Sequence, residues 1–282
     1  MAPSKRDEPV TRRRPPGDPV FLRRVMSAFV LAPVSLTLVV VGGHAFAIFV
    51  AAFAAAMAWE WVRMSDTAAP PRAFSIATST AVGAALLSAQ DAYGWTVVWI
   101  LAGAIAAGAD RWPRGRAWEA VFGVVYVAGS VAVLVSLRDG DHGGLKSIVF
   151  LLAIVWAADT FAYLVGSWIG GPKLLPSASP NKTWAGLIAG LVCGVGAGLA
   201  LADWVGVGVQ GAIAIAGPTA VVAVLGDRFM SLAKRRFGVK DAGSLIPGHG
   251  GVLDRVDALM LATLFAGAVA LLAPGGWPGG AV

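Results

Sequence analysis

Charged residues are scarce in this chain. Only 13% of its 282 residues are Asp, Glu, Lys or Arg, whereas 57% are hydrophobic and the mean hydropathy is +0.73. An ordinary soluble domain is about one-quarter charged, and it could not bury so much apolar surface. Since each transmembrane helix needs about 20 apolar residues, the composition favours a membrane protein with many spans and short loops.

Cysteine and the common nucleotide-binding motifs are also lacking. Cys193, the only cysteine, lies in an apolar run, so no internal disulfide and no multi-cysteine metal site can form. No GxxxxGK[ST] loop and no GxGxxG motif in a strand-turn-helix setting occurs. Basic residues outnumber acidic ones, 22 to 16, but they are spread between apolar runs. We therefore expect no nucleic-acid partner.

Nine apolar segments follow a basic, proline-rich start. Residues 1–24 cannot bury a core and are expected to form a disordered cytoplasmic tail. The segments predict an all-α, polytopic integral membrane protein with about nine transmembrane helices. We expect helices 1–5 in residues 25–137, and catalytic helices 6–9 in residues 145–273 with cytoplasmic loops 171–183 and 226–255. The expected spans are residues 25–42, 44–62, 73–89, 94–109, 118–137, 145–170, 183–202, 207–225 and 256–273.

The positions of Lys and Arg predict the orientation of these spans. Lys and Arg in short loops are retained on the cytoplasmic side of a membrane. With the N-terminus inside, nine spans leave only Arg138 and Lys146 of the 22 basic residues outside. We therefore expect a multi-pass protein of the cell membrane with a cytoplasmic N-terminus and an external C-terminus.

Glycines recur every four residues in the seventh predicted span. Such a ridge lets another helix approach closely in lipid. Tight packing within one chain is favoured, and the seam of a homodimer is the alternative. The ridge consists of Gly186, Gly190, Gly194 and Gly198, and Gly166 and Gly170 repeat the spacing in the sixth span.

The stretch between the last two spans is far more polar than the rest of the chain. From Asp227 to Phe237, helical spacing places Asp227, Ser231 and Lys234 on one face, and Gly238 is a natural helix end. A carboxylate, a hydroxyl and a cation thus share one stripe.

A glycine turn at residues 247–251 comes next, followed by two acids at the start of the last span. Asp254 and Asp257 are three residues apart, so both can face the same way. Carboxylates beside cations and open backbone N–H groups suit a magnesium–nucleotide site. The alternative is a solvated basic loop, which we disfavour because interfacial carboxylates are costly unless they are used.

This polar stretch resembles the signature of the phosphatidate cytidylyltransferase (CDP-diacylglycerol synthase) family. The family pattern runs Ser, Lys-Arg, Lys-Asp, a small residue, Pro-x-His-Gly-Gly and Asp-Arg-x-Asp. It is met by Ser231, Lys234-Arg235, Lys240-Asp241, Gly243, Pro247 to Gly251, and Asp254 to Asp257.

A second stretch is similar to the family's Ser-Pro-Lys-Lys-Thr-Trp-Glu-Gly. The residues here are Ser179-Pro180-Asn181-Lys182-Thr183-Trp184-Ala185-Gly186. Asn181 replaces a lysine, Ala185 replaces a glutamate, and Phe161 stands where the family usually has glycine.

The resemblance implies an Mg²⁺-dependent nucleotidyl transfer with one or two metal ions. CTP and phosphatidic acid would give CDP-diacylglycerol and pyrophosphate, in phospholipid biosynthesis. A phosphate monoester has its second pKa near about 6, so the lipid phosphate needs no strong general base. Charge neutralisation and alignment are what the protein must supply.

Resemblance and residue type together assign roles to individual residues. Asp227, Asp254 and Asp257 are the expected Mg²⁺ ligands. His249 is expected to donate a hydrogen bond rather than act as a base. Glu60, between Trp59 and Trp61, is expected to anchor the membrane interface outside the site. The expected catalytic residues are Asp227, Ser231, Lys234, His249, Asp254 and Asp257, and the expected substrate contacts are Asp159, Ser179, Lys182, Arg235, Lys240, Gly250 and Gly251.

Two other function classes are open to such a chain. Another CTP-dependent membrane enzyme, such as a polyprenol or dolichol kinase or an archaeal-lipid cytidylyltransferase, would need similar metal and cation groups. A transporter would show paired discontinuous helices in two matching halves, and the sequence has no such repeat. The run from Lys240 to Asp257 favours phosphatidate as the acceptor.

Cysteine labelling tests the predicted orientation. In a chain without Cys193, a cysteine at Gly140 should react with a membrane-impermeant reagent added outside, and one at Lys240 should react only after the cytoplasmic side is opened. Labelling of the Gly140 position only from the cytoplasmic side would contradict the topology.

Overall fold

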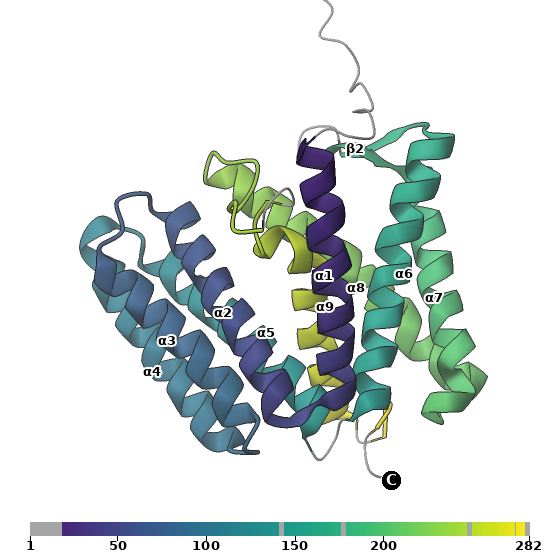
Figure 1. Cartoon of the computed structure of the whole chain (residues 1–282), viewed down its shortest axis with the longest axis horizontal. Helices are drawn as coiled ribbons and strands as arrows, with labels where there is room; N and C mark the ends of the chain where they lie inside the picture. Colours follow the sequence, from purple (N-terminus) through teal and green to yellow (C-terminus); the bar gives the residue numbers. More distant parts are fainter. Residues whose placement is uncertain (1–18, 141–143, 176–178, 247–249, 274, 280–282) are drawn as a thin grey trace, which may run out of the picture.

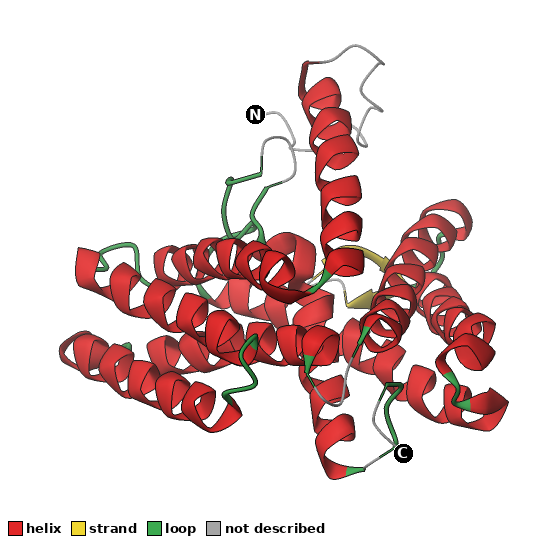
Figure 2. Ribbon diagram, turned by 60° about the horizontal axis from the view of Figure 1, so that its bottom comes forward, coloured by secondary structure: helices red, strands yellow, loops and turns green. Residues whose placement is uncertain are grey.

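The computed structural model describes residues 19–140, 144–175, 179–246, 250–273 and 275–279. Nine α-helices account for most of these residues, and two short strands form the only sheet among them (Figures 1 and 2). The helices are α1 (Pro19–Val41), α2 (Gly43–Ser65), α3 (Pro71–Ser88), α4 (Tyr93–Arg111), α5 (Ala117–Asp139), α6 (Leu145–Ile169), α7 (Trp184–Val205), α8 (Gly208–Arg236) and α9 (Leu253–Leu272).

The prediction of an all-α polytopic membrane protein is confirmed. Within the described residues, seven helices are long and apolar enough to cross a membrane, namely α2 and α4 to α9. Helix α3 is less apolar because it carries several hydroxyl side chains, and the described apolar part of α1 is only Phe29–Val41. Helix α1 begins at Pro19, earlier than the predicted boundary near residue 25.

The helices pack as two groups joined through α9. Helices α2 to α5 pack against one another, as do α6 to α8, and α9 packs against α2, α5, α6 and α8 (Figure 1). Helix α1 lies across the front of this bundle, against α2 and α6. The last helices are thereby held against the N-terminal half of the chain.

Polar contacts tie the helix ends at both ends of the bundle. At one end, Arg116 donates to the Ser65 carbonyl at 2.6 Å, and Arg236 pairs with Glu119 at 3.1 Å. These contacts join the ends of α2 and α8 to the start of α5. At the other end, Arg138 donates to the backbone carbonyls of α1. Helix directions alternate as the sequence predicts, and which end faces the cytoplasm remains a prediction.

Helix α8 extends beyond the expected span of residues 207–225 and runs to Arg236. The first third of the expected loop 226–255 is therefore helical, in agreement with the helical spacing noted from Asp227 onwards. Three cations, Lys234, Arg235 and Arg236, lie in its last turn, where they complement the helix dipole. Gly238 has a φ of +74°, so it leaves the helix in the conformation that glycine adopts most easily.

The glycine ridge of α7 packs within the chain. A Cβ atom added at Gly190 would lie 2.7 Å from the Ala158 carbonyl oxygen of α6. One at Gly194 would lie 3.1 Å from the Cβ of Ala220 in α8. The ridge is therefore used for close approach of α7 to α6 and α8, as the sequence favoured.

Substitution of the ridge should loosen this packing. We expect Gly190→Ala to lower the thermal midpoint in detergent, since overpacking costs about 1–3 kcal/mol. Gly196 is the matched control, because it lies on the same helix and an added Cβ would meet nothing within 4 Å. Gly196→Ala should leave the midpoint unchanged or slightly raised. Equal midpoints for the two variants would contradict a packing role.

Candidate active site

A short hairpin carries the first cation of the site. Strands β1 (Lys173–Leu175) and β2 (Ser179–Thr183) pair antiparallel between α6 and α7. Thr183 caps α7, since its Oγ1 accepts a hydrogen bond from the Gly186 N–H at 3.1 Å. The second family-like stretch thus fixes the junction of β2 and α7, one residue after Lys182. Ser179, an expected substrate contact, is in β2 opposite Leu175.

Lys182 forms an ion pair with Asp227 on α8. Burial lowers the pKa of Lys182, and the nearby carboxylates of Asp257 and Asp159 oppose that shift. The residues expected from two distant parts of the sequence therefore meet in space. Three carboxylates from α6, α8 and α9 share the field of one ammonium group.

A second cation lies between the acids of α9. The Nζ atom of Lys234 is 2.6 Å from Asp254 Oδ1 and 3.8 Å from Asp257 Oδ2. The α-helical spacing of Asp227 and Lys234 brings both to the side of α8 that faces α9, and α8 approaches closely there because Gly226 has no side chain. A Cβ at Gly226 would lie 2.9 Å from the Asp257 carbonyl oxygen.

Asp254 holds the signature loop. Its Oδ2 atom accepts hydrogen bonds from the Ala242 N–H at 2.9 Å and from the Gly251 N–H at 3.1 Å, while Oδ1 receives Lys234. Both oxygens of this expected metal ligand thus have protein donors. The role as a ligand remains a prediction, and the structure adds a second role as the anchor that closes the loop.

Glu60 lies beneath this loop, and the expectation that it merely anchors the membrane interface is wrong. Its side chain is buried, with 1% of the residue exposed. Its two carboxylate oxygens accept hydrogen bonds from the N–H groups of Val252 at 3.0 Å and Leu253 at 2.9 Å. These N–H groups belong to the first turn of α9, where a negative charge also meets the positive end of the helix dipole.

The glycines of the loop leave room for this carboxylate. A Cβ atom at Gly251 would lie 2.8 Å from both oxygens of Glu60 and 2.7 Å from the backbone nitrogen of Gly243. A Cβ at Gly243 would meet Glu60 as well. Gly250 has a φ of +87°, which favours glycine, and the Ile246 N–H donates to its carbonyl at 2.9 Å to close the turn.

The remaining expected residues differ in their exposure. Arg235 is exposed and donates to the Val239 carbonyl, and Lys240 is exposed on the loop. Ser231 lies one turn after Asp227 on α8 and is half-buried. His249 lies outside the described residues, so its role as a hydrogen-bond donor stays a prediction.

Known proteins are similar to this chain in sequence. Residues 22–272 match the model of the cytidylyltransferase family. This chain belongs to the cytidylyltransferase family. A phosphatidate cytidylyltransferase of Brucella abortus is 41% identical over 85% of this chain and 89% of its own length. Enzymes of the same name from Pseudomonas aeruginosa and Haemophilus influenzae are 34% and 30% identical, over 98% and 96% of their own lengths.

Membership of the cytidylyltransferase family confirms the resemblance seen in residues 231–257. It also raises the question of a metal ion. Within the described residues, no three Asp, Glu, His or Cys side chains gather around a point where they could hold one. Mg²⁺ usually needs only one or two carboxylates when phosphates and waters supply its other ligands. Asp227 and Asp257 fit that requirement, because Asp227 faces the ammonium group of Lys182 and Asp257 Oδ2 faces that of Lys234, while only Asp257 Oδ1 accepts from a backbone N–H, that of Ala258.

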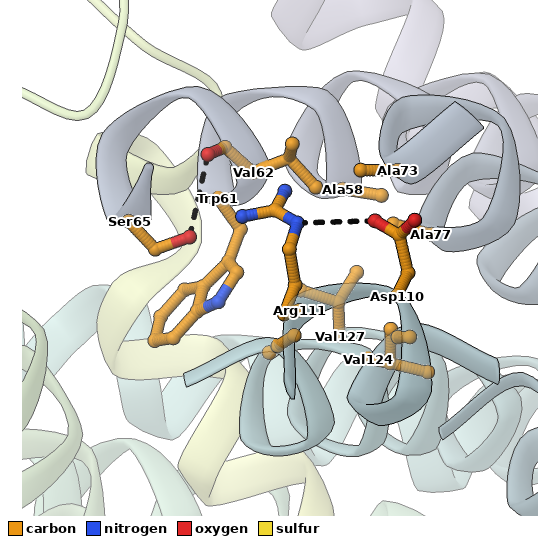
Figure 3. Close-up of a pocket in the computed structure, with 13 residues that line it drawn as sticks. Ala58, Trp61, Val62, Ser65, Ala73, Ala77, Asp110, Arg111, Val124 and Val127 are labelled. Carbon is orange, nitrogen blue, oxygen red and sulfur yellow. Dashed lines mark hydrogen bonds and ion pairs between the residues drawn. The ribbon is translucent and has the colours of Figure 1, made fainter. Parts of the chain in front are cut away.

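A second polar cluster lies in the N-terminal half, but it is not a ligand site. Arg111 is 2% exposed and pairs with Asp66 at 2.7 Å. It also lies 3.4 Å from Asp110, as Figure 3 shows. The cavity beside these residues has a volume of about 10 Å³, which is scarcely enough for one water molecule. This cluster therefore ties the residue that follows α2 to the end of α4, at the end of the bundle that also carries the cytidylyltransferase signature.

Glu60 is the site residue that sequence reasoning missed. An acid flanked by tryptophans at the end of a span is typical of interfacial anchoring, and nothing local distinguishes it. Its 192-residue separation from Val252 hides the contact. Two features of the sequence could have indicated the contact. A carboxylate near the end of an apolar span is costly unless it has a partner, and the two loop glycines, Gly243 and Gly251, leave space for a side chain from elsewhere in the chain.

Replacement of Glu60 should loosen the loop. In glutamine an NH₂ group replaces one of the two carboxylate oxygens, and this group cannot accept a hydrogen bond. One of the two backbone N–H groups would therefore lose its acceptor, and leaving a buried donor unsatisfied costs about 1–3 kcal/mol. We expect Glu60→Gln to raise hydrogen–deuterium exchange in residues 242–253 and to lower turnover, with Glu60→Ala more severe.

Glu119→Gln is the matched control for this prediction. Glu119 is also an acid at this end of the bundle, but its partner Arg236 is well exposed, so the pair should contribute about 0–1 kcal/mol. Unchanged exchange of residues 242–253 in Glu60→Gln would show that the carboxylate does not hold the loop.

Proposed function

We propose that this chain is a phosphatidate cytidylyltransferase, which transfers the cytidylyl group of CTP to phosphatidic acid. The observation that carries the proposal is the identity of 41% to a relative of that name over 89% of the relative's length. The residues support it, because the signature of the family forms one cluster of carboxylates and cations at the end of the helix bundle.

The reaction needs charge neutralisation more than proton transfer. An oxygen of the lipid phosphate attacks the α-phosphorus of CTP, a new P–O bond forms, and the bond to the β-phosphate oxygen breaks as pyrophosphate leaves. The lipid phosphate is largely dianionic at neutral pH, so it attacks without a strong base. The difficulty is to bring two highly charged phosphates together.

Lys182 and Lys234 are suited to that task. Each ammonium group now pairs with carboxylates, at Asp227 and at Asp254, and phosphate oxygens would be equivalent acceptors for it. We assign Lys182 to the phosphate of the lipid or of CTP, and Lys234 with the exposed Arg235 and Lys240 to the triphosphate and the departing pyrophosphate. Gly250 and Gly251 stay expected substrate contacts, although the Gly251 N–H already donates to Asp254.

The expected cofactor is Mg²⁺, as one or two ions. Asp227 and Asp257 would hold it together with phosphate oxygens, and Asp254 is a further expected ligand whose oxygens now meet protein donors. When bound, Mg²⁺ supplies positive charge that offsets the charge developing on the leaving pyrophosphate.

The expected location is the cell membrane, with this site on the cytoplasmic side. The charge distribution supports that side, because Arg63, Arg114 and Arg116 lie at the same end of the bundle as the signature loop. CTP is a soluble nucleotide and phosphatidic acid is a lipid, so a site at one membrane face meets both.

Turnover of purified protein with labelled CTP and phosphatidic acid tests the proposal. We expect activity that requires Mg²⁺, and none with a polyprenol or dolichol acceptor. Asp227→Asn and Asp254→Asn should each lower the rate of cytidylyl transfer by about 100-fold or more, since each removes a charge that the cluster needs.

Asp241→Asn is the control, because Asp241 is exposed and lies in the same loop away from the cluster, and its effect should be milder. Near-normal turnover of Asp227→Asn or Asp254→Asn at limiting Mg²⁺ would refute the assignment of that aspartate as a metal ligand. A wild-type enzyme that ignores phosphatidic acid would refute the function.

A further inference from the structure

Tyr126 of α5 carries a buried hydroxyl group without a partner. The residue is 5% exposed, and among the described residues its hydroxyl oxygen makes no hydrogen bond. Its ring is well held, because it stacks on Phe122 at a centroid distance of 5.4 Å and meets Phe229 of α8 edge-on at 5.6 Å. A buried polar group without a partner is costly, so a hydroxyl at this position points to a partner that it gains when the site is occupied.

The packing of α5 against α9 places this hydroxyl beside the proposed transfer site. Both helices begin near the end of α2 and run in the same direction. Along them, Ser130 of α5 donates to the Met260 carbonyl of α9 at 3.4 Å. Tyr126 and Asp257 each lie about one turn earlier on their own helix, so they are at the same level. The Tyr126 hydroxyl accordingly lies in the electrostatic field of the Asp257 carboxylate.

One oxygen of the Asp257 carboxylate needs a donor. Its Oδ1 atom accepts from the Ala258 N–H at 2.9 Å, whereas Lys234 Nζ lies 3.8 Å from Oδ2, beyond hydrogen-bond distance. The ammonium group of Lys234 is instead bonded to Asp254 at 2.6 Å. Within the described part of the chain, Asp257 Oδ2 therefore has no hydrogen-bond donor, in contrast to both oxygens of Asp254.

Substrate binding would also draw the nearby cations away from Asp257. The carboxylate lies in the field of Lys182 and Lys234, and both of these are assigned above to substrate phosphates. A tyrosine hydroxyl differs from them, because it can hold a carboxylate oxygen by a hydrogen bond and carries no charge that repels a metal ion. Such bonds orient the carboxylates that bind metals, and their loss typically weakens metal binding or activity by about 10–100-fold.

We propose that Tyr126 is a positioning residue, whose hydroxyl donates a hydrogen bond to Asp257 Oδ2 once substrate phosphates have engaged Lys234. This inference rests on the proposed function and adds a residue from the N-terminal half of the chain to the site. The bond keeps the Asp257 carboxylate oriented toward the metal and the phosphates, while the contacts of the ring with Phe122 and Phe229 keep the donor in place. Tyr126 acts through Asp257 and does not touch the reacting atoms.

Two hydroxyl groups offer a matched pair for testing. Tyr126→Phe removes only the hydroxyl and keeps the ring between its aromatic neighbours. Ser88→Ala is the control, because Ser88 is 1% exposed and its hydroxyl is likewise without a partner among the described residues, but it ends α3, which packs against α2, α4 and α5. Since neither variant breaks a hydrogen bond of the unliganded protein, neither should lower the thermal midpoint in detergent.

The first measurement is the calorimetric affinity of the purified protein, without lipid, for the magnesium complex of CTP. We expect Tyr126→Phe to bind it about tenfold more weakly than the wild type, and Ser88→Ala to match the wild type. In turnover, Tyr126→Phe should need about tenfold more Mg²⁺ for half-maximal rate, with the KM for phosphatidate unchanged. Wild-type affinity together with a wild-type Mg²⁺ requirement in Tyr126→Phe would overturn the positioning role while the proposed function stands. A wild-type protein that binds no CTP would instead refute the proposed function.

A double-mutant cycle tests whether Tyr126 acts through Asp257. If it does, Tyr126→Phe should cause no further loss of cytidylyl transfer in a chain that already carries Asp257→Asn, because the two changes remove the same interaction. The residual rates are compared at one saturating concentration of Mg²⁺, of CTP and of phosphatidate. A further loss as large as that caused by Tyr126→Phe alone would show that the hydroxyl acts independently of Asp257, and would overturn the proposal.

Discussion

The contact of the buried Glu60 carboxylate with the first turn of α9 is the constraint on which the site depends. It joins the N-terminal half of the bundle to the signature loop through the N–H groups of Val252 and Leu253. Removal of either side would leave buried polar groups without partners, which is more costly than never having formed the contact. Gly243 and Gly251 are small because this carboxylate occupies the space beside them.

The fixed start of α9 positions the charged groups of the site. Asp254 closes the loop and receives Lys234, while Asp257 faces the same ammonium group one turn later. Helix α8 adds Asp227, and the hairpin adds Lys182 opposite it. The cations and carboxylates balance one another at a place where isolated charges would be costly. In the proposed reaction, substrate phosphates would replace carboxylates as partners of the same lysines.

Much of this arrangement could be predicted from sequence, because hydropathy and charge act locally. The nine apolar segments correspond to α1 to α9, and the Asp227, Ser231, Lys234 stripe lies on a helix as its spacing indicates. The hairpin at β1 and β2 was not predicted, since strands of three and five residues leave little periodic signal. Glu60 could not be placed, because its role arises from a contact with a helix that is remote in the sequence.

The central claim is that Lys182, Asp227, Lys234 and Asp257 form the nucleotidyl-transfer site. An experimental structure of the protein with CTP and Mn²⁺ in place of Mg²⁺ tests it most directly, because the anomalous signal of manganese locates the metal. We predict manganese bound to the carboxylates of Asp227 or Asp257, with the triphosphate contacting Lys182 or Lys234. Manganese and triphosphate bound at any other place, for example beside Asp66 and Asp110, would contradict the account.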